Sequence, residues 1–306
     1  MPTVLITGGT GLIGKALTKE LRKKNYDLII LTRSPEKYTN SQGLSYAKWN
    51  VEDQLIDKDA IAEADHVIHL AGENVGDKRW TKKRKKQIVE SRTLTSALLI
   101  KALKERPNNV KTVVSASGIG WYGEQKKSEP FIETDPPAGD FLGQTCKEWE
   151  ASIEPVTTLG KRLVKLRTGI VLSRDGGALD EFKKPLRFGF ATILGNGKQV
   201  VSWIHIDDLV RLFVYAMENE SLHGAYNAVA PHPVTNRTFV IELGRKMKGR
   251  FFIPVYIPSF VLKIILGEMS IEVLKNANVS CEKIKQNGFD FLYPTLLTAF
   301  QQIGGG

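Results

Sequence analysis

The chain has 306 residues, 43 of them Lys or Arg and 33 Asp or Glu, so its formal net charge is +10. With 42% hydrophobic and 25% charged residues, it has the composition of a globular protein, which argues against a disordered, collagen-like or coiled-coil chain. Two cysteines cannot build a disulfide framework, and this favours a reducing, cytoplasmic location. No uninterrupted apolar stretch is long enough for a membrane span.

Short apolar runs rich in β-branched residues alternate with amphipathic segments along the first half of the chain. The strand-like runs are 4–7, 28–32, 66–71, 112–115 and 163–173. Helix-like segments include 15–24, 93–106 and 144–153, and 204–217 reads as a strand end followed by a helix. Repeated strand–helix order predicts an α/β fold, with a Rossmann-like doubly wound parallel sheet.

A glycine-rich turn follows the first strand-like run. The sequence TGGTGLIG at 7–14 spaces Gly8, Gly11 and Gly14 three residues apart, directly before a helix. Gly8 allows a tight turn, Gly11 lets a pyrophosphate approach the backbone, and Gly14 lets the helix pack closely on the strand. Because a helix N-terminus also attracts anions, the pattern predicts dinucleotide binding.

The end of the second strand-like run indicates which dinucleotide is preferred. An acidic residue here would hold the ribose 2′-hydroxyl of NAD, whereas an arginine accommodates the 2′-phosphate of NADP. The chain has Arg33 and Ser34 at this position and no acid. We therefore expect NADP(H) to be preferred over NAD(H).

Much of the positive charge lies in one segment. Residues 78–86, KRWTKKRKK, contain seven basic residues and no acid, so the rest of the chain carries 10 − 7 = +3. The segment fits a solvated helix face, an attraction for an anionic cofactor or substrate, or a nucleic-acid or lipid contact. No nucleic-acid-reading module is visible, so we expect no specific nucleic-acid partner. The histidines lack metal-ligand spacing, and we expect no metal.

Taken with these features, the chain resembles the extended and atypical short-chain dehydrogenase/reductase superfamily. Within it, the chain is similar to the epimerase family proteins, which end in a small C-terminal domain of unknown function. The motifs that carry the resemblance are TGGTGLIG (7–14), HLAGENV (69–75), SRT (91–93), SASGIGWYG (115–123), QTCKEWE (144–150), LRTGIVLS (166–173), SWIHIDD (202–208), GAYNAVAP (224–231) and GFDFLYP (288–294).

The resemblance and the glycine pattern together give a set of expected site residues. Those expected to bind the cofactor are Thr7, Gly8, Gly9, Thr10, Gly11, Leu12, Ile13, Gly14, Arg33, Ser34, Leu70, Ala71, Gly72, Arg92, Ser115 and Arg167. Glu73, Asn74 and Lys147 are expected to contact substrate. Ser117 matches the catalytic Ser or Thr of the superfamily, and Tyr122 the Tyr of a Tyr-Gly pair.

The chain departs from the superfamily at its usual acid/base pair. These enzymes use a Tyr and, four residues later, a Lys that lowers the pKa of the Tyr. Leu142 and Cys146 stand at the two aligned positions, and Lys147 is one residue further on. Tyr122 is then the first candidate for the acid/base role. Alternatively, the protein does not run carbinol oxidation.

We expect residues 1–173 and 201–221 to form the NADP-binding domain. Residues 174–200 and 222–306 would form a smaller substrate lobe, with 252–300 as the family-specific C-terminal domain. The leading functional hypothesis is an NADP-dependent epimerase or oxidoreductase acting on a polar small molecule, such as a sugar nucleotide. The alternative is a non-catalytic NADPH-binding redox sensor. A homodimer is among the states open to the chain.

Overall fold

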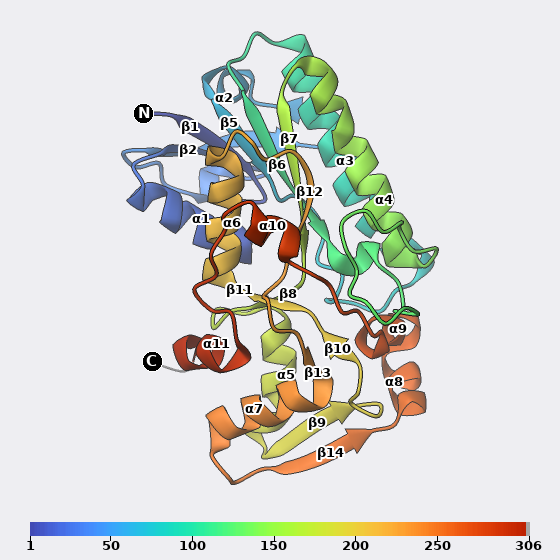
Figure 1. Cartoon of the computed structure of the whole chain (residues 1–306). Coiled ribbons are helices and arrows are strands. Elements are labelled where there is room, and N and C mark those ends of the chain that lie inside the picture. The colour runs from blue at the N-terminus through green and yellow to red at the C-terminus, as the bar shows by residue number, and fades with distance from the viewer. Residues whose placement is uncertain (304–306) are drawn as a thin grey trace.

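A computed structural model describes residues 1–303 of the chain (Figure 1). Its centre is an eight-stranded sheet in the order β12-β7-β6-β5-β1-β2-β3-β4, parallel throughout except for β4. The strands are β1 (Thr3–Thr7), β2 (Asp27–Thr32), β3 (Leu44–Asn50), β4 (Leu55–Ile56), β5 (His66–His69), β6 (Thr112–Gly118), β7 (Arg162–Thr168) and β12 (Gly224–Ala228). This sheet confirms the predicted α/β, doubly wound fold class.

Helices cover both faces of the sheet. They are α1 (Leu12–Lys23), α2 (Lys58–Glu63), α3 (Lys82–Glu105), α4 (Phe141–Ile153) and α6 (Ile206–Glu218). Helices α1 and α6 pack together on one face, and α3 and α4 on the other (Figure 1). Strand β1 is buried on both faces, with Val4, Leu5 and Ile6 fully inaccessible, because alternate side chains enter the two helix layers.

A smaller lobe lies beyond the carboxyl ends of the sheet strands. It contains three two-stranded sheets, β8 with β11, β9 with β14, and β10 with β13. Its strands are β8 (Ile170–Leu172), β9 (Phe190–Leu194), β10 (Val200–Val201), β11 (Trp203–His205), β13 (Val234–Thr235) and β14 (Ile253–Ile257). Its helices are α5 (Ala178–Arg187), α7 (Asn236–Lys248), α8 (Ser259–Leu266), α9 (Ser270–Leu274) and α11 (Leu296–Ile303). Its own core includes Leu179, Trp203 and Phe239.

Two segments differ from the sequence-based division into lobes. The predicted lobe began again at 222, yet β12 pairs in parallel with β7 and belongs to the large sheet. Farther along, the segment with α10 (Glu282–Gln286) packs Ile284 and Phe289 into the core between the sheet and α6. The chain therefore returns to the large domain twice after 222, since β12 adds its outermost strand and the α10 segment adds apolar side chains to its core. Residues 304–306 of the predicted lobe lie outside the described residues.

The predicted run 163–173 is also two strands. Gly169 separates β7, in the large sheet, from β8, in the lobe. A Cβ at Gly169 would lie 2.7 Å from the Ser202 carbonyl oxygen, so glycine lets the chain cross close to β11 on its way between the two parts. Asp208 of α6 fastens the C-terminal segment to this crossing, since its carboxylate accepts the N–H groups of Leu292 and Tyr293.

Candidate cofactor site

The turn between β1 and α1 excludes side chains at two positions. Gly8 has φ +69°, and a Cβ there would approach the Leu70 carbonyl carbon to 2.9 Å. A Cβ on Gly14 would lie 2.4 Å from Gly9 Cα. The turn is closed by the Gly11 N–H, which donates to the Gly8 carbonyl at 3.0 Å. Helix and strand therefore lie as close as a dinucleotide-binding turn requires.

Helix α1 begins without a capping side chain. Gly11 is its N-cap, and the first turn holds no acidic residue. The first N–H groups of a helix, here those of Leu12 and Ile13, have no partner inside it and carry a partial positive charge. Thr10 is half-buried and Gly11 exposed, so this end of the helix faces solution. It suits a pyrophosphate.

A buried hydrogen-bond chain ties the turn to the end of β5. Thr7 Oγ1 accepts the N–H groups of Leu70 and Ala71 at 3.1 and 3.2 Å and lies 2.8 Å from His69 Nδ1. Its own proton therefore goes to Nδ1, and His69 carries its proton on Nε2, which donates to Ser96 Oγ at 3.2 Å. Complete burial lowers the pKa of His69 to about 4, so the ring is neutral. This chain fixes the strand end that leads into Gly72.

Arg92 lies beneath Gly72 on α3 and is buried. It donates to the carbonyl oxygens of Ile88 at 2.8 Å and Glu73 at 3.0 Å. Its guanidinium stacks 4.8 Å from the Trp149 ring. A Cβ on Gly72 would come within 3.2 Å of the Arg92 side chain. Arg92 therefore holds the backbone that the cofactor is expected to touch.

The end of β2 is basic and open. Arg33 is exposed and Ser34 half-buried, and within residues 1–303 the Arg33 guanidinium forms no hydrogen bond or ion pair. On the neighbouring strand Lys48 pairs in register with Thr32, and its ammonium donates to the Arg33 carbonyl oxygen at 2.7 Å. Two cations thus flank the position where an acid would select NAD.

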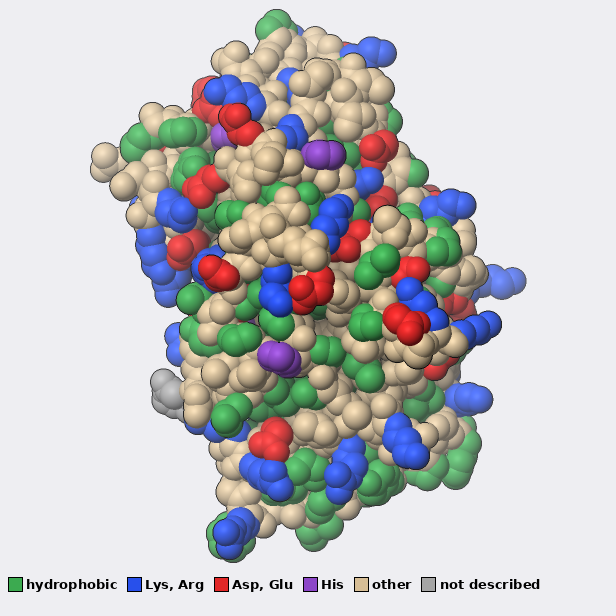
Figure 2. Space-filling view, in the orientation of Figure 1, with side chains coloured by type: hydrophobic (Ala, Val, Ile, Leu, Met, Phe, Trp, Pro, Cys, Tyr) green, Lys and Arg blue, Asp and Glu red, His purple; other side chains and the backbone are tan. Residues whose placement is uncertain are grey.

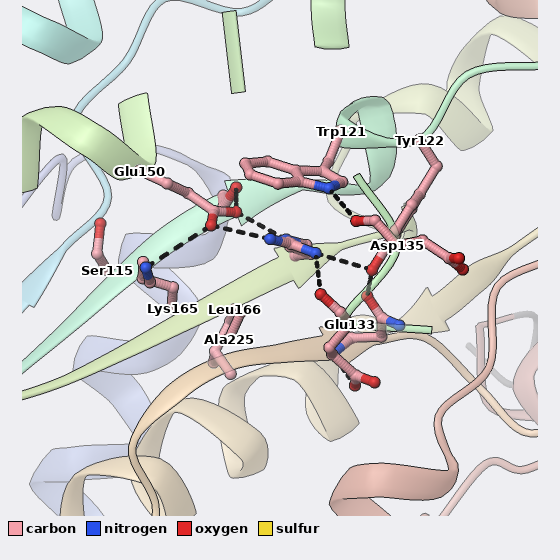
Figure 3. A network of polar contacts seen from close by, with 12 residues as sticks. Ser115, Trp121, Tyr122, Glu133, Asp135, Glu150, Lys165, Leu166 and Ala225 are labelled. Carbon is pink, nitrogen blue, oxygen red and sulfur yellow. Dashed lines mark hydrogen bonds and ion pairs between the residues drawn. The ribbon is translucent and has the colours of Figure 1, made fainter. Parts of the chain in front are cut away.

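A buried network of charged groups lies at the carboxyl ends of β6 and β7 (Figure 3). Glu150 of α4 accepts two hydrogen bonds from Arg167, at 2.8 and 3.0 Å, and one from the Ser117 hydroxyl at 2.8 Å. Lys165 adds an ion pair at 3.8 Å. Only 4% of the Arg167 side chain and 6% of the Glu150 side chain are exposed. This bidentate pair joins α4 to the sheet.

Tyr122 lies in the same network, and none of its surface is exposed. Its hydroxyl accepts from Arg167 at 3.0 Å and donates to Asn227 Oδ1 at 2.7 Å. Arg167 also donates to the Glu133 carbonyl oxygen and stacks 3.7 Å from the Trp121 ring. Burial raises the pKa of Tyr122 to about 12. The network therefore anchors the segment after β6, and in this conformation both partners of the Tyr122 hydroxyl are protein groups.

Helix α4 shows what occupies the positions of the superfamily's usual acid/base pair. Leu142 packs beside Gly120, where a Cβ would come within 3.1 Å of it. Cys146 is buried near Gly118, and burial raises its pKa to about 12, so it is a thiol at neutral pH. Lys147 lies on the exposed side of the helix. The structure does not bring Lys147 together with the other predicted site residues.

The loop after β5 is held by the basic segment 78–86. Arg84 is buried and donates to Glu73 Oε2 at 2.9 Å and to the Asn74 carbonyl oxygen at 2.5 Å. Trp80 is also buried, and its indole N–H donates to the Val75 carbonyl oxygen at 2.8 Å. Part of this segment is therefore structural rather than a solvated face.

The C-terminal segment contacts the same side of the molecule. Lys85 pairs with Glu268 at 2.8 Å. Lys275, only 5% of whose side chain is exposed, pairs with Asp140 at 2.8 Å and with Glu272 at 2.7 Å. Asp140 also caps α4 through the Gly143 N–H. These ion pairs join α9 and its flanking residues to the start of α3 and α4.

The predicted site residues thus fall into two groups. One group lies at the carboxyl ends of the central strands β1, β2 and β5. It consists of residues 7–14, residues 70–72 and the residues that follow β2. Ser115, Ser117, Tyr122 and Arg167 are buried, and Ser115 donates only to the Ala116 carbonyl oxygen. His69, Ser96, Glu150 and Asn227 were not among the predicted site residues. Their one signal in the sequence is a polar side chain within a strand or helix that is otherwise apolar. Among residues 1–303 no cluster of His, Cys, Asp and Glu is arranged to hold a metal ion, and no helix is long and apolar enough to cross a bilayer.

Comparison with known proteins identifies relatives along the whole chain. The model of the NAD dependent epimerase/dehydratase family matches residues 4–142 and 184–228, and a domain of unknown function, DUF1731, matches 257–303. Epimerase family protein ML0860 of Mycobacterium leprae (strain TN) is 34% identical over 96% of this chain and 92% of its own length. Epimerase family protein SAR0825 of Staphylococcus aureus (strain MRSA252) is 34% identical over 99% of both chains.

Solved structures share this architecture. The human epimerase family protein SDR39U1 (isoform 2), solved with NADPH, superposes with a TM-score of 0.85 at 30% identity and covers 99% of both chains. A UDP-glucose 4-epimerase from Thermotoga maritima, solved with UDP-glucose, has a TM-score of 0.79 at 21% identity over 99% of this chain and 97% of its own. At that identity the second likeness shows the fold alone.

Proposed function

The chain belongs to the NAD dependent epimerase/dehydratase family, and on that premise we propose that it binds NADP(H) across the carboxyl ends of β1, β2 and β5. The observation that carries this proposal is the tight Gly8–Gly14 turn, which opens directly into the uncapped N-terminus of α1. The pyrophosphate would accept hydrogen bonds from the free backbone N–H groups at this helix end. Human SDR39U1, at 30% identity, was solved with NADPH, which supports the same cofactor here.

NADP(H) is preferred over NAD(H) in this proposal. Arg33 and Lys48 supply two cations at the end of β2, and a 2′-phosphate forms charge-assisted hydrogen bonds with such groups. With no acid at the end of β2, nothing there accepts the 2′-hydroxyl of NAD as the selective residue of NAD enzymes does.

The substrate of this proposal is a polar small molecule held near the end of β5. Glu73 has a side chain that is 46% exposed, and Asn74 is exposed beside it. Arg84 and Arg92 keep both in place, so two polar groups stand on a rigid loop. The bound cofactor would supply hydride chemistry, while these residues would orient the substrate. Loops at the carboxyl ends of parallel strands are the usual position of such contacts.

A second candidate function is NADPH binding without turnover. This alternative is favoured because the side chains that could exchange a proton with substrate are buried or already donate to other protein groups. Ser117 and Tyr122 donate to protein groups inside the buried network, and Cys146 is buried with a pKa raised to about 12. Proton exchange with a carbinol requires a group within hydrogen-bond reach of it. In this alternative the bound cofactor itself is the signal, and a partner reads whether it is present.

The cofactor proposal is tested by fluorescence titration with NADPH. Gly11→Val is the informative variant, because Gly11 has extended φ and ψ and a Cβ there meets only the Gly8 carbonyl oxygen, at 3.3 Å. The Gly8 carbonyl oxygen has to move by a few tenths of an ångström to admit this Cβ, so the melting temperature of the variant is measured alongside, and the side chain would occupy the proposed pyrophosphate position. Gly139→Val is the matched control, since a Cβ at Gly139 has nothing within 4 Å. We expect the first variant alone to lose binding, and equal binding by both would contradict the proposal.

Turnover separates the two candidate functions. The protein is incubated with NADPH deuterated at C4 and a panel of carbonyl compounds and keto-sugar nucleotides. Deuterium in a product supports the enzyme, since hydride and proton have then both been delivered. Tight NADPH binding without transfer to any compound of the panel supports the second candidate.

A further inference from the structure

Two turns meet at the end of the lobe farthest from the large sheet (Figure 1). One follows α5 and the other follows α7. The Ile253 N–H donates to the Gly189 carbonyl oxygen at 2.8 Å, and Phe190 pairs in register with Ile253. This pairing places Phe190 beside Ile253, and Phe188 and Phe251 stand two residues before them in the two turns. We call these four side chains the apolar tip.

The apolar tip is exposed rather than part of the lobe core. Phe188 is 81% exposed, Phe251 88%, Ile253 62% and Phe190 46%. The core is on the other side of β9, where Ala191 and Ile193 are fully buried. Exposed apolar side chains gathered in one place on a globular protein are a sign of an interaction surface.

The apolar tip is surrounded by positive charge. Residues 182–190 and 244–253 together contain seven basic residues and no acid. Arg187 precedes Phe188, and Lys248 and Arg250 precede Phe251. None of these three cations has an ion pair or side-chain hydrogen bond within residues 1–303. Figure 2 shows blue basic side chains among green apolar ones at the lower end of the molecule. The tip therefore has an unneutralised cationic border.

A cavity adjoins the tip on the α7 side. It has a volume of about 510 Å³ and is lined by Arg237, Thr238, Ile241, Glu242, Arg245, Gly249, Arg250, Phe252 and Pro254. Three arginines thus face a space large enough for a phosphate-bearing headgroup, and Glu242 is its one acid, paired with Arg245. Arg250, one of the arginines that line this cavity, is next to Phe251 in the chain.

The charge and the backbone both disfavour a second copy of this chain as the occupant. A two-fold contact through the tip would bring the same patch from each copy together, so the cationic borders would oppose each other. Strand β14 has an open edge, yet Pro254 interrupts its row of N–H groups, which hinders pairing with another strand. An anionic surface with an apolar interior meets neither obstacle.

We propose that the apolar tip docks on an anionic lipid bilayer. Phe188, Phe251 and Ile253 enter the boundary between headgroups and acyl chains. Arg187, Lys248 and Arg250 contact the lipid phosphates, and the arginine-lined cavity receives one headgroup. Apolar insertion combined with basic residues at an anionic leaflet is the physics of proteins that lie on membranes. Helix α5 begins near the glycine-rich turn, where a Cβ on Gly177 would lie 3.1 Å from the Leu12 side chain, and it ends at the tip, so docking by the tip leaves the cofactor site open to solution.

Vesicle co-sedimentation of the full chain with saturating NADPH tests the proposal. The vesicles are phosphatidylcholine alone or phosphatidylcholine with a quarter phosphatidylglycerol. We expect binding to the second kind only, weakened by salt. Phe188→Ser/Phe251→Ser should abolish it, and Arg187→Ser/Arg250→Ser should weaken it by about fivefold for each arginine. Leu55→Ser is the control, since Leu55 is 52% exposed on β4, at the far edge of the large sheet.

Each outcome decides. Loss of binding in Phe188→Ser/Phe251→Ser and weakened binding in Arg187→Ser/Arg250→Ser, with wild-type binding by Leu55→Ser and unchanged melting temperatures, support the proposal. Binding to neither vesicle at low salt overturns it, as does equal binding by Phe188→Ser/Phe251→Ser. Light scattering adds a further readout. If the wild-type chain dimerises without vesicles and the Phe188→Ser/Phe251→Ser variant is monomeric, the tip is an interface between copies, and the proposal is wrong.

Discussion

Replacing Glu150 by Leu removes the acceptor at the centre of the buried network. Arg167 then keeps its charge but loses both hydrogen bonds to the carboxylate, and the Ser117 hydroxyl loses its acceptor. Arg167 retains only Tyr122 and the Glu133 carbonyl oxygen as polar partners. Because the guanidinium is almost completely buried, water cannot replace what is lost.

The expected destabilisation follows from that burial. Breaking a buried ion pair from one side lowers the free energy of unfolding by about 3–5 kcal/mol, since an uncompensated charge remains. Adding Arg167→Met removes that charge. The second substitution gives up two neutral-acceptor hydrogen bonds, which together contribute about 2 kcal/mol. We therefore expect the double variant to be more stable than Glu150→Leu alone.

Urea unfolding measures this directly. Tryptophan fluorescence follows the network, because Trp121 stacks on Arg167. Glu148→Leu, on the exposed side of the same helix, is the control and should change stability by less than about 0.5 kcal/mol. The reasoning is refuted if Glu150→Leu costs less than about 1 kcal/mol, or if the two single effects simply add in the double variant.

Three further predictions concern the edges of the site. Thr7→Val leaves the Ala71 N–H without its acceptor and His69 Nδ1 without its donor, while the Leu70 N–H keeps the Thr7 carbonyl oxygen, so thermal unfolding should show a loss of about 2–4 kcal/mol. Thr18→Val, at a half-buried position of α1, is a milder comparison, and an unchanged melting temperature in Thr7→Val would contradict the assignment. His69 has a folded pKa of about 4, below its unfolded value of 6.5, so the unfolded state binds more protons between these values and stability decreases as the pH is lowered. Urea unfolding should show a loss of about 2 kcal/mol from pH 7 to pH 5, and His69→Gln should abolish this loss. An equal pH dependence in both proteins would exclude His69 as its source. Lys275→Met leaves Asp140 and Glu272 facing each other without their cation, so amide exchange in 270–280 should accelerate relative to Lys246→Met, and equal protection would show that the pair does not hold this segment.

The sequence predicts the centre of the sheet well because its strands are buried on both faces. Strand β1 is one continuous apolar run, and the adjoining glycine spacing identifies the turn. Strand β12 escapes this rule, since its buried residues include Asn227, and a polar residue interrupts the pattern that indicates a strand. Strand β3 is half-buried along most of its length and lacks an apolar run.

The residues of the candidate site also differ in how well the sequence could predict them. Residues that act through backbone geometry, such as Gly8 and Gly14, could be found from spacing. Arg167 and Tyr122 could not be assigned to a buried network, because their partners lie 17 residues away at Glu150 and 105 residues away at Asn227. A charged side chain looks the same in a sequence whether it meets a phosphate or a carboxylate.

The basic segment shows a similar limit. Composition locates seven cations at 78–86, but Arg84 and Trp80 are buried in contacts with the loop after β5. Which cations face solvent depends on the position of a loop that precedes them. The second cationic cluster, around the apolar tip, becomes visible only when β14 pairs with β9 and brings its two halves together.

The central claim is that Arg33 and the glycine-rich turn hold NADP(H). The most direct measurement is isothermal titration of the wild-type chain, Arg33→Ala and the exposed control Arg106→Ala with NADPH and with NADH. We predict that the wild type and the control bind NADPH more tightly than NADH by roughly 10- to 100-fold, as a charge-assisted contact to the 2′-phosphate requires. Arg33→Ala should lose most of this preference while its affinity for NADH stays the same. Equal wild-type affinities for the two cofactors, or a preference that Arg33→Ala leaves intact, would contradict the account.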